Sequence, residues 1–211
     1  MGLSRVRVKM CGMTRSEDIA HAVNLGVDAI GLIFHPASKR NVTLEQASSL
    51  LKNLPPFVDA VAVLVNPEKV FVEEILMQLP IQLIQFHGDE THEFCQQFNK
   101  PFIKAIQPDS QAHILRAVAD FSSAQAVLLD TPSEHARGGT GCTFDWAIIP
   151  HEMKKPFILA GGLDESNVCD AITSSSPYAV DLCSGIEVSP GVKDHKKMSS
   201  FMKKVVGCKQ S

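Results

Sequence analysis

Cys11 stands at a point in the chain where a thiol can do more than fill space. It ends the first apolar run, RVRVKMC, and is followed at once by Gly12. Side chains alternate between the two faces of a strand, so Lys9 would share a face with Cys11. A nearby ammonium favours the thiolate, which is the basic form of cysteine. Free cysteine is also among the most buried residue types, so the residue type alone favours an inert, packed thiol, and the position at the end of the run makes the two interpretations equally open.

Asp130 is a second titratable group in the same kind of position, because it ends the apolar run AVLLD. A carboxylate after four apolar residues must be paired, exposed at a rim, or kept partly protonated. Cys11 and Asp130 on two sides of one ligand would supply a base and an acid, whereas an aspartate that only caps the following loop is the alternative. His87, in QFHGDE, is a histidine at the end of an apolar run, and a structural role or a ligand contact fits it.

Two glycine-bearing segments, LAGGL and LCSGIEVSPG, have the composition of phosphate-binding loops. Gly161, Gly162 and Gly185 would let backbone N–H groups approach an anion closely, and Ser184 would add a hydroxyl. Glycines at strand ends are also ordinary turn residues. We favour phosphate binding because both segments carry glycine.

Other polar segments give weaker signals. Arg40, in HPASKRNV, would pair bidentately with a substrate carboxylate, although most loop arginines are merely solvated. The stretch TPSEHARGGTGCTFDW after Asp130 fits either a mobile lid or a plain surface loop. It contains no nucleotide-binding motif, and the eight histidines of the chain show no metal-ligand spacing. We therefore expect neither a nucleotide nor a metal.

Eight short runs rich in Val, Ile and Leu must position these groups. They are RVRVKMC, AIGLIF, VDAVAVLV, IQLIQFHG, PFIKAIQ, AVLLD, PFILAGG and YAVDLCSG. Segments of helical periodicity lie between most of these runs. Three of the helical segments begin at Ser16, Thr43 and Pro67, and the segment that begins at Ser16 ends at Gly26. This alternation predicts right-handed βαβ units with parallel strands. Eight units in 211 residues match a single α/β domain, a (β/α)8 TIM barrel spanning 1–211, better than an open sheet of about five or six strands.

Barrel enzymes place their sites at the carboxyl ends of the strands. In this chain nearly every run finishes in a polar, titratable or glycine residue. The predicted ends are Cys11-Gly12, Phe34-His35, Val65-Asn66, His87-Gly88, Gln107, Asp130-Thr131, Gly161-Gly162 and Ser184-Gly185. This gradient predicts one functional face.

The composition narrows the class of partner. The formal net charge of −3 gives no footprint for nucleic acid, and no apolar run reaches the length of about 18 residues that a membrane span needs. A small molecule is the expected partner. The six cysteines contain no CxxC pair, so we do not expect a disulfide framework and we expect a reducing, cytoplasmic compartment.

Six ordered segments together resemble the phosphoribosylanthranilate isomerase family over nearly the whole chain. They are KMCGMTRSEDI, GLIFHPASKRNV, IQFHGDE, LLDT followed by GGTGCTFDW, LAGGLDESNV and VDLCSGIEVSPGVKD. The resemblance implies a (β/α)8 barrel without metal or organic cofactor. It implies an Amadori rearrangement of N-(5′-phosphoribosyl)anthranilate to 1-(2-carboxyphenylamino)-1-deoxyribulose 5-phosphate by general acid–base catalysis, in tryptophan biosynthesis.

The resemblance also implies roles for single residues. The family's catalytic cysteine falls on Cys11, its catalytic aspartate on Asp130, and its carboxylate-binding arginine on Arg40. The other implied contacts are with the substrate at His87, Gly139 and Gly141, and with its phosphate at Gly161, Gly162, Ser184 and Gly185.

The chain departs from the family pattern at two places. Where the family usually has Ser-Pro-Arg-Tyr, this chain has Ser38-Lys39-Arg40-Asn41, which lacks a rigid proline and an aromatic ring. Arg137 adds a positive charge where the family often has glycine or another small residue. Both departures leave the chemistry in place and bear on substrate affinity and loop geometry.

Two other functions are compatible with such a barrel. A histidine-pathway aminoaldose–ketose isomerase performs the same chemistry, but we expect paired aspartates there, and here the first strand ends in Cys11. A non-catalytic barrel that only binds a sugar phosphate is the second, and the presence of both Cys11 and Asp130 argues against it. The sequence leaves a monomer and a homodimer equally open.

Overall fold

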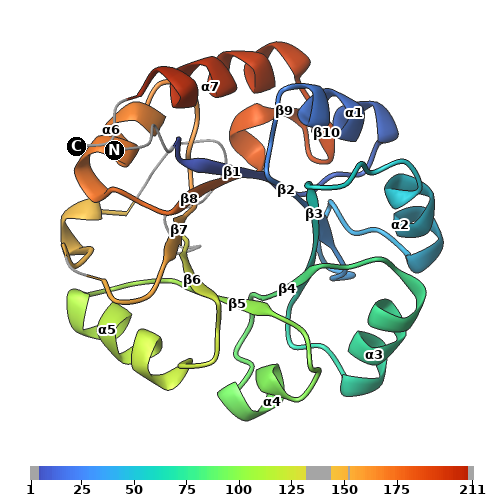
Figure 1. Cartoon of the computed structure of the whole chain (residues 1–211), viewed down its shortest axis with the longest axis horizontal. Helices are drawn as coiled ribbons and strands as arrows, with labels where there is room; N and C mark the ends of the chain where they lie inside the picture. The colour runs from blue at the N-terminus through green and yellow to red at the C-terminus, as the bar shows by residue number, and fades with distance from the viewer. Residues whose placement is uncertain (1–4, 132–143, 152, 209–211) are drawn as a thin grey trace.

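The protein is a closed barrel of eight parallel strands in chain order, β1 to β8, surrounded by helices (Figure 1). The computed structural model describes residues 5–131, 144–151 and 153–208. The strands are β1 (Arg7–Met10), β2 (Ala29–Ile33), β3 (Asp59–Leu64), β4 (Leu83–Phe86), β5 (Phe102–Ile106), β6 (Ala126–Leu129), β7 (Phe157–Leu159) and β8 (Ala179–Leu182). The predicted (β/α)8 barrel is confirmed.

The connections between strands form the outer ring in Figure 1. The helices are α1 (Ser16–Asn24), α2 (Leu44–Leu51), α3 (Lys69–Gln78), α4 (His92–Gln96), α5 (Gln111–Asp120), α6 (Val168–Ser175) and α7 (His195–Gly207). Short 3₁₀ helices η1 (Trp146–Ile148) and η2 (Ser184–Ile186) follow β6 and β8, and a small hairpin, β9 (Glu187–Ser189) with β10 (Val192–Lys193), precedes α7.

The helix boundaries follow local capping chemistry, with two corrections. Thr43 caps α2 in a capping box with Gln46, and Gly26, at φ 79°, follows the end of α1, both as expected. Ser16 is the first residue of α1 and not its cap, because Arg15 occupies the cap position without a side-chain bond. Pro67 lies two residues before α3, which begins at Lys69.

Apolar side chains pack in two layers. The larger layer lies between the barrel and the helices and includes fully buried Phe86 and Phe201. The smaller layer fills the barrel interior on the side of β5 to β8 with residues such as Ile103, Leu128 and Ala160. The interior at β1, β4 and β8 is polar instead, so the barrel carries charged groups beneath its carboxyl end.

One disulfide departs from the expectation drawn from cysteine spacing. Cys169 in α6 bonds Cys208 just after α7, with Cα atoms 5.6 Å apart and a sequence separation of 39. The two helices pack against each other, and only this packing brings the thiols together. No described helix is long and apolar enough to cross a membrane.

Candidate active site

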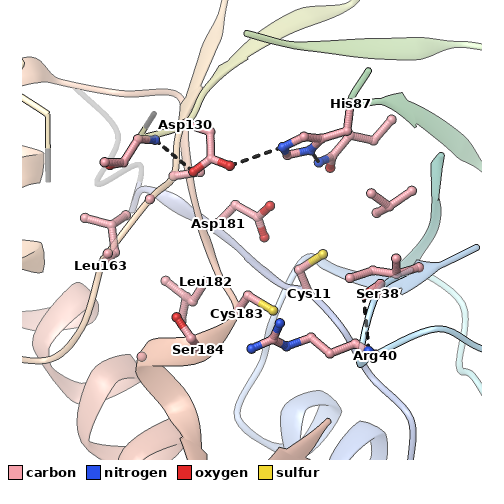
Figure 2. A pocket seen from close by; sticks show the side chains of 18 of the residues that line it. Cys11, Ser38, Arg40, His87, Asp130, Leu163, Asp181, Leu182, Cys183 and Ser184 are labelled. Carbon is pink, nitrogen blue, oxygen red and sulfur yellow. Dashed lines mark hydrogen bonds and ion pairs between the residues drawn. The ribbon is translucent and has the colours of Figure 1, made fainter. Parts of the chain in front are cut away.

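A cavity of about 690 Å³ opens at the carboxyl end of the barrel, and each of the eight barrel strands, or the residues just after it, contributes to its lining. The predicted strand ends therefore converge on one site, as Figure 2 shows from close by. Among the residues with predicted roles, those that line it are Cys11, Arg40, His87, Asp130, Gly161, Gly162, Ser184 and Gly185. Arg137, Gly139, Gly141 and most of the segment 131–146 considered as a lid lie in 132–143, outside the described residues.

Cys11 directly follows β1 and lies almost fully buried at the wall of this cavity, 5% exposed. A side chain at position 31 of the neighbouring strand would have its Cβ 2.6 Å from Cys11 Sγ, so Gly31 leaves the room that the thiol occupies. A hydrogen bond from the Cys183 thiol lowers the pKa of Cys11 well below its usual value. Burial opposes this shift, and the charges of Lys9 and Lys193 support it. The thiolate form of Cys11 is therefore favoured, in agreement with the expectation drawn from Lys9 on the same face of the strand.

A buried ion pair lies one layer below Cys11. Lys9 Nζ is 2.7 Å from Asp181 Oδ2, and both side chains are less than a tenth exposed. Burial raises the pKa of Asp181 to about 7; the Lys9 charge opposes this rise and the Cys11 charge adds to it. Asp181 Oδ1 has no partner among the described residues. Sequence reasoning missed Asp181, although a charged residue inside the apolar run YAVDLC was a usable signal.

On the opposite side of the cavity, Asp130 is held by two donors (Figure 2). The Thr131 amide donates to Asp130 Oδ1 at 2.9 Å, and His87 Nε2 lies 3.1 Å from Asp130 Oδ2. Gln85, two residues before His87 on the same face, lies 2.9 Å from its Nδ1. Burial works against a charged imidazole, but the bond to Asp130 outweighs it and raises the pKa of His87. Both Asp130 and His87 side chains remain 26% exposed and so are reachable from the cavity.

The loops after β7 and β8 meet at the cavity wall. Gly161 and Gly162 have φ of 82° and 66°, a region that side chains rarely adopt. A Cβ at Gly161 would collide with Thr131, and one at Gly185 would collide with the Leu163 carbonyl. The backbone N–H groups of Gly162 and Ser184 donate to no other described residue. These free donors suit an anion, and phosphate binding stays a prediction.

Arg40 reaches the cavity but is already paired. Its Nε and Nη2 donate to Glu187 Oε1 and Oε2 at 2.8 and 2.6 Å. Lys193 Nζ lies 2.9 Å from the same carboxylate. Burial disfavours the charge on Glu187, but these two cations outweigh it and lower the pKa of Glu187. The Nη1 edge of Arg40 bonds no other described residue, so a substrate carboxylate would have to use that edge. No local sequence pattern predicts this pairing across a separation of 147 residues.

Comparison with known proteins identifies the family. The sequence model for N-(5′-phosphoribosyl)anthranilate (PRA) isomerase matches residues 8–204 of the chain. The chain belongs to the PRA isomerase family. A PRA isomerase of Legionella pneumophila strain Lens is 65% identical over 207 residues, covering 98% of this chain and 100% of that protein.

Solved structures of the PRA isomerase family share the fold. The enzyme from Thermotoga maritima is 37% identical, with a TM-score of 0.88 over 96% of this chain and 99% of that one. A PRA isomerase in complex with reduced 1-(o-carboxyphenylamino)-1-deoxyribulose 5-phosphate is 34% identical, with a TM-score of 0.82 and the same coverage. The expected isomerase of tryptophan biosynthesis is thereby confirmed. The described residues contain no group of three or more His, Cys, Asp or Glu side chains that could hold a metal ion.

Proposed function

We propose that Cys11 is the general base and Asp130 the general acid of the Amadori rearrangement of N-(5′-phosphoribosyl)anthranilate. The observation that carries this assignment is their placement: a thiol that favours its basic form and a carboxyl group bonded to His87 line one cavity from β1 and β6. Two titratable groups in different environments on two sides of a substrate are the arrangement that proton transfer needs.

The first step is opening of the ribose ring. The ring oxygen is a poor leaving group until it is protonated, and Asp130 supplies that proton. The hydrogen bond between Asp130 and His87, whose pKa is raised, keeps a proton on this side of the cavity. The nitrogen lone pair of the anthranilate then forms an iminium with C1′.

The second step is proton abstraction. The iminium acidifies the C2′ proton, and the Cys11 thiolate removes it to give an enolamine, which tautomerises to the ketone. Cys11 acts here as a base and forms no bond to carbon. Each proton transfer by a positioned group contributes roughly 10²- to 10⁴-fold to the rate.

The rest of the cavity would bind the two ends of the substrate. The free N–H groups of Gly162 and Ser184 support a phosphate site, together with Gly161 and Gly185, which keep side chains away from it. The Nη1 edge of Arg40 would receive the anthranilate carboxylate, and His87 would contact the sugar through the side facing Asp130. Binding energy from these groups, far from the reacting carbons, would hold C2′ against the thiolate.

Loss of anthranilate-type fluorescence on mixing with freshly prepared substrate tests this assignment. We expect Asp130→Asn and Cys11→Ala each to lower turnover by about 10² or more while still binding a product analogue. Cys95→Ala is the matched control, because Cys95 is fully buried outside the cavity. Wild-type turnover in either site variant would remove the proposed role of that residue.

Partners and location belong to the same proposal. The protein is proposed to be a monomer or a homodimer, and a PRA isomerase of Thermotoga maritima is described as dimeric. A cytoplasmic location is proposed because Cys11 works as a base only while it is reduced, and a reducing compartment favours that state; the Cys169–Cys208 disulfide is of a kind rarely found there. Sedimentation of the purified protein and fractionation of cells test these two statements.

A further inference from the structure

A second cysteine, Cys183, lies beside Cys11, and the proposed reaction does not use it as an acid or a base. Strands β1 and β8 pair in parallel, with Met10 opposite Leu182, and the Cys11 amide donates to the Leu182 carbonyl at 2.7 Å. Cys11 and Cys183 therefore occupy the next, equivalent positions on neighbouring strands. The pair below them, Lys9 and Asp181, already meets inside the barrel, so alternation turns both thiols toward the same cavity.

This register suits a covalent bond between the two sulfurs. Neighbouring strands lie about 4.8 Å apart, and a disulfide spans Cα atoms about 4.4 to 6.8 Å apart. The two thiols lie close enough for each to shift the pKa of the other, that of Cys11 downward and that of Cys183 upward. Figure 2 shows both sulfur atoms at the cavity between Asp181 and Arg40.

The surroundings also favour reaction of Cys11 with an oxidant. Lys9 and Lys193 place positive charge near the Cys11 sulfur, and Lys193 Nζ lies 3.9 Å from Cys183 Sγ. Thiolate character and access decide which cysteine a peroxide oxidises. Cys95 has neither, because it is fully buried and burial raises its pKa to about 12. The described free cysteines thus divide into a reactive pair and an inert one.

We propose that Cys11 and Cys183 form a peroxide-sensitive pair that closes reversibly to a disulfide across the mouth of the barrel. The Cys11 thiolate attacks one oxygen of a hydroperoxide, the O–O bond breaks, and Cys11 becomes a sulfenic acid while the other oxygen leaves as water or an alcohol. The Cys183 sulfur then attacks Cys11, the S–O bond breaks, and a second water leaves with the thiol proton. Two thiols are oxidised by two electrons, and the peroxide is reduced by two.

The disulfide would remove the base from the site and so switch the isomerase off until a thiol reductant restores it. The loss of activity rests on the proposed role of Cys11 as the base, whereas formation of the Cys11–Cys183 disulfide does not. Mass and turnover are therefore measured on the same sample.

The experiment uses the full-length protein carrying Cys142→Ser, because Cys142 lies outside the described residues. The protein is treated with hydrogen peroxide, free thiols are alkylated, and intact mass and peptides are analysed. We expect a loss of about 2 Da in the intact mass before alkylation and two labels fewer than in untreated protein after it. We also expect a cross-linked peptide pair containing Cys11 and Cys183, complete loss of turnover, and its recovery with dithiothreitol. Cys95 should remain free.

The matched variant Cys183→Ser separates cross-linking from simple oxidation. Without the resolving thiol, Cys11 should gain about 16 or 32 Da, and turnover should not return fully with dithiothreitol after excess peroxide. The proposal is overturned if native Cys11 gains oxygen with no cross-linked peptide, or if it stays free to alkylation. Turnover that persists in cross-linked protein would support the pair and contradict the role of Cys11 as the base.

Discussion

At the scale of single residues, the groups around Cys11 determine that its thiolate, the basic form, is favoured. The sulfur of Cys11 is buried, which by itself disfavours the thiolate, and the Cys183 thiol, Lys9 and Lys193 reverse that preference. The acid is arranged differently, because Asp130 stays partly exposed and is held by His87 and Thr131.

Removal of the thiol donor tests this description of Cys11. In Cys183→Ala the thiolate loses its hydrogen bond, so the pKa of Cys11 should rise and the acid limb of the pH profile of kcat/KM should move to higher pH. Cys183→Ser keeps a hydroxyl donor and should move the limb less. Alkylation rates measured against pH check the same order, and an unshifted limb in both variants would contradict it.

The buried Asp181 makes a pH-dependent contribution to stability. Its pKa is raised in the folded state to about 7 from an ordinary value near 4, so the folded protein binds the extra proton between these values. The contribution of Asp181 to the free energy of unfolding should therefore fall as the pH rises through this window, by up to about 4 kcal/mol. Urea unfolding from pH 4 to 8 measures the free energy of unfolding of wild type and Asp181→Asn. The stability of the wild type relative to the variant should fall as the pH rises, and a relative stability that rises with pH would contradict the assignment.

At the scale of elements, the loops that follow the strands are fixed by buried polar groups. Glu90, after β4, accepts hydrogen bonds from the amides of Asn66 and Gly88 and pairs with buried Lys104 at 2.9 Å. This cluster holds the loop that carries His87.

Glu90→Gln would leave the Lys104 charge buried without a counterion. We expect a loss of about 3 to 5 kcal/mol in the free energy of unfolding. Glu73→Gln is the matched control, because the Lys69–Glu73 pair on α3 is exposed at 3.7 Å and should cost no more than about 0.5 kcal/mol. Equal losses in the free energy of unfolding for Glu90→Gln and Glu73→Gln, measured by denaturant unfolding, would refute the expected difference between the buried and the exposed ion pair.

The need for glycine at position 161, after β7, can also be tested against a matched control, Gly26. Gly161 and Gly26 both have positive φ, but only a Cβ at Gly161 meets other atoms, those of Thr131. Gly26→Ala should cost about 1 to 2 kcal/mol of stability and leave KM unchanged. Gly161→Ala should cost more and raise KM, because the loop must shift. An unchanged KM in Gly161→Ala would separate this loop from substrate binding.

At the scale of the whole molecule, local sequence patterns predict the barrel and not its polar interior. Eight Val-, Ile- and Leu-rich runs are each a local signal, and the barrel rule then brings Cys11 and Asp130 to one face. The pairing of Lys9 with Asp181, and of Arg40 with Glu187, depends on which strands close the barrel and in which register. No local pattern records contacts between segments so far apart, and the Cys169–Cys208 disulfide was missed for the same reason.

That disulfide ties α6 to the end of α7, outside the cavity. Its reduction, or Cys208→Ser, should lower the free energy of unfolding by about 2 to 4 kcal/mol, because the unfolded chain regains the freedom of the closed loop. Turnover at low temperature should be unchanged, since neither sulfur lines the site. Guanidinium unfolding with and without dithiothreitol checks the first statement, and equal midpoints would contradict it.

Removal of the C2′ proton by Cys11 can be measured in a single turnover. Excess wild-type protein or Cys11→Ala is mixed with limiting N-(5′-phosphoribosyl)anthranilate, and the loss of fluorescence is followed. We expect rapid loss of fluorescence with the wild type. With Cys11→Ala, fluorescence should fall only at the slow rate of the substrate alone, although this variant still binds the product analogue. A variant that converts substrate within about tenfold of the wild-type rate would show that another group removes the proton.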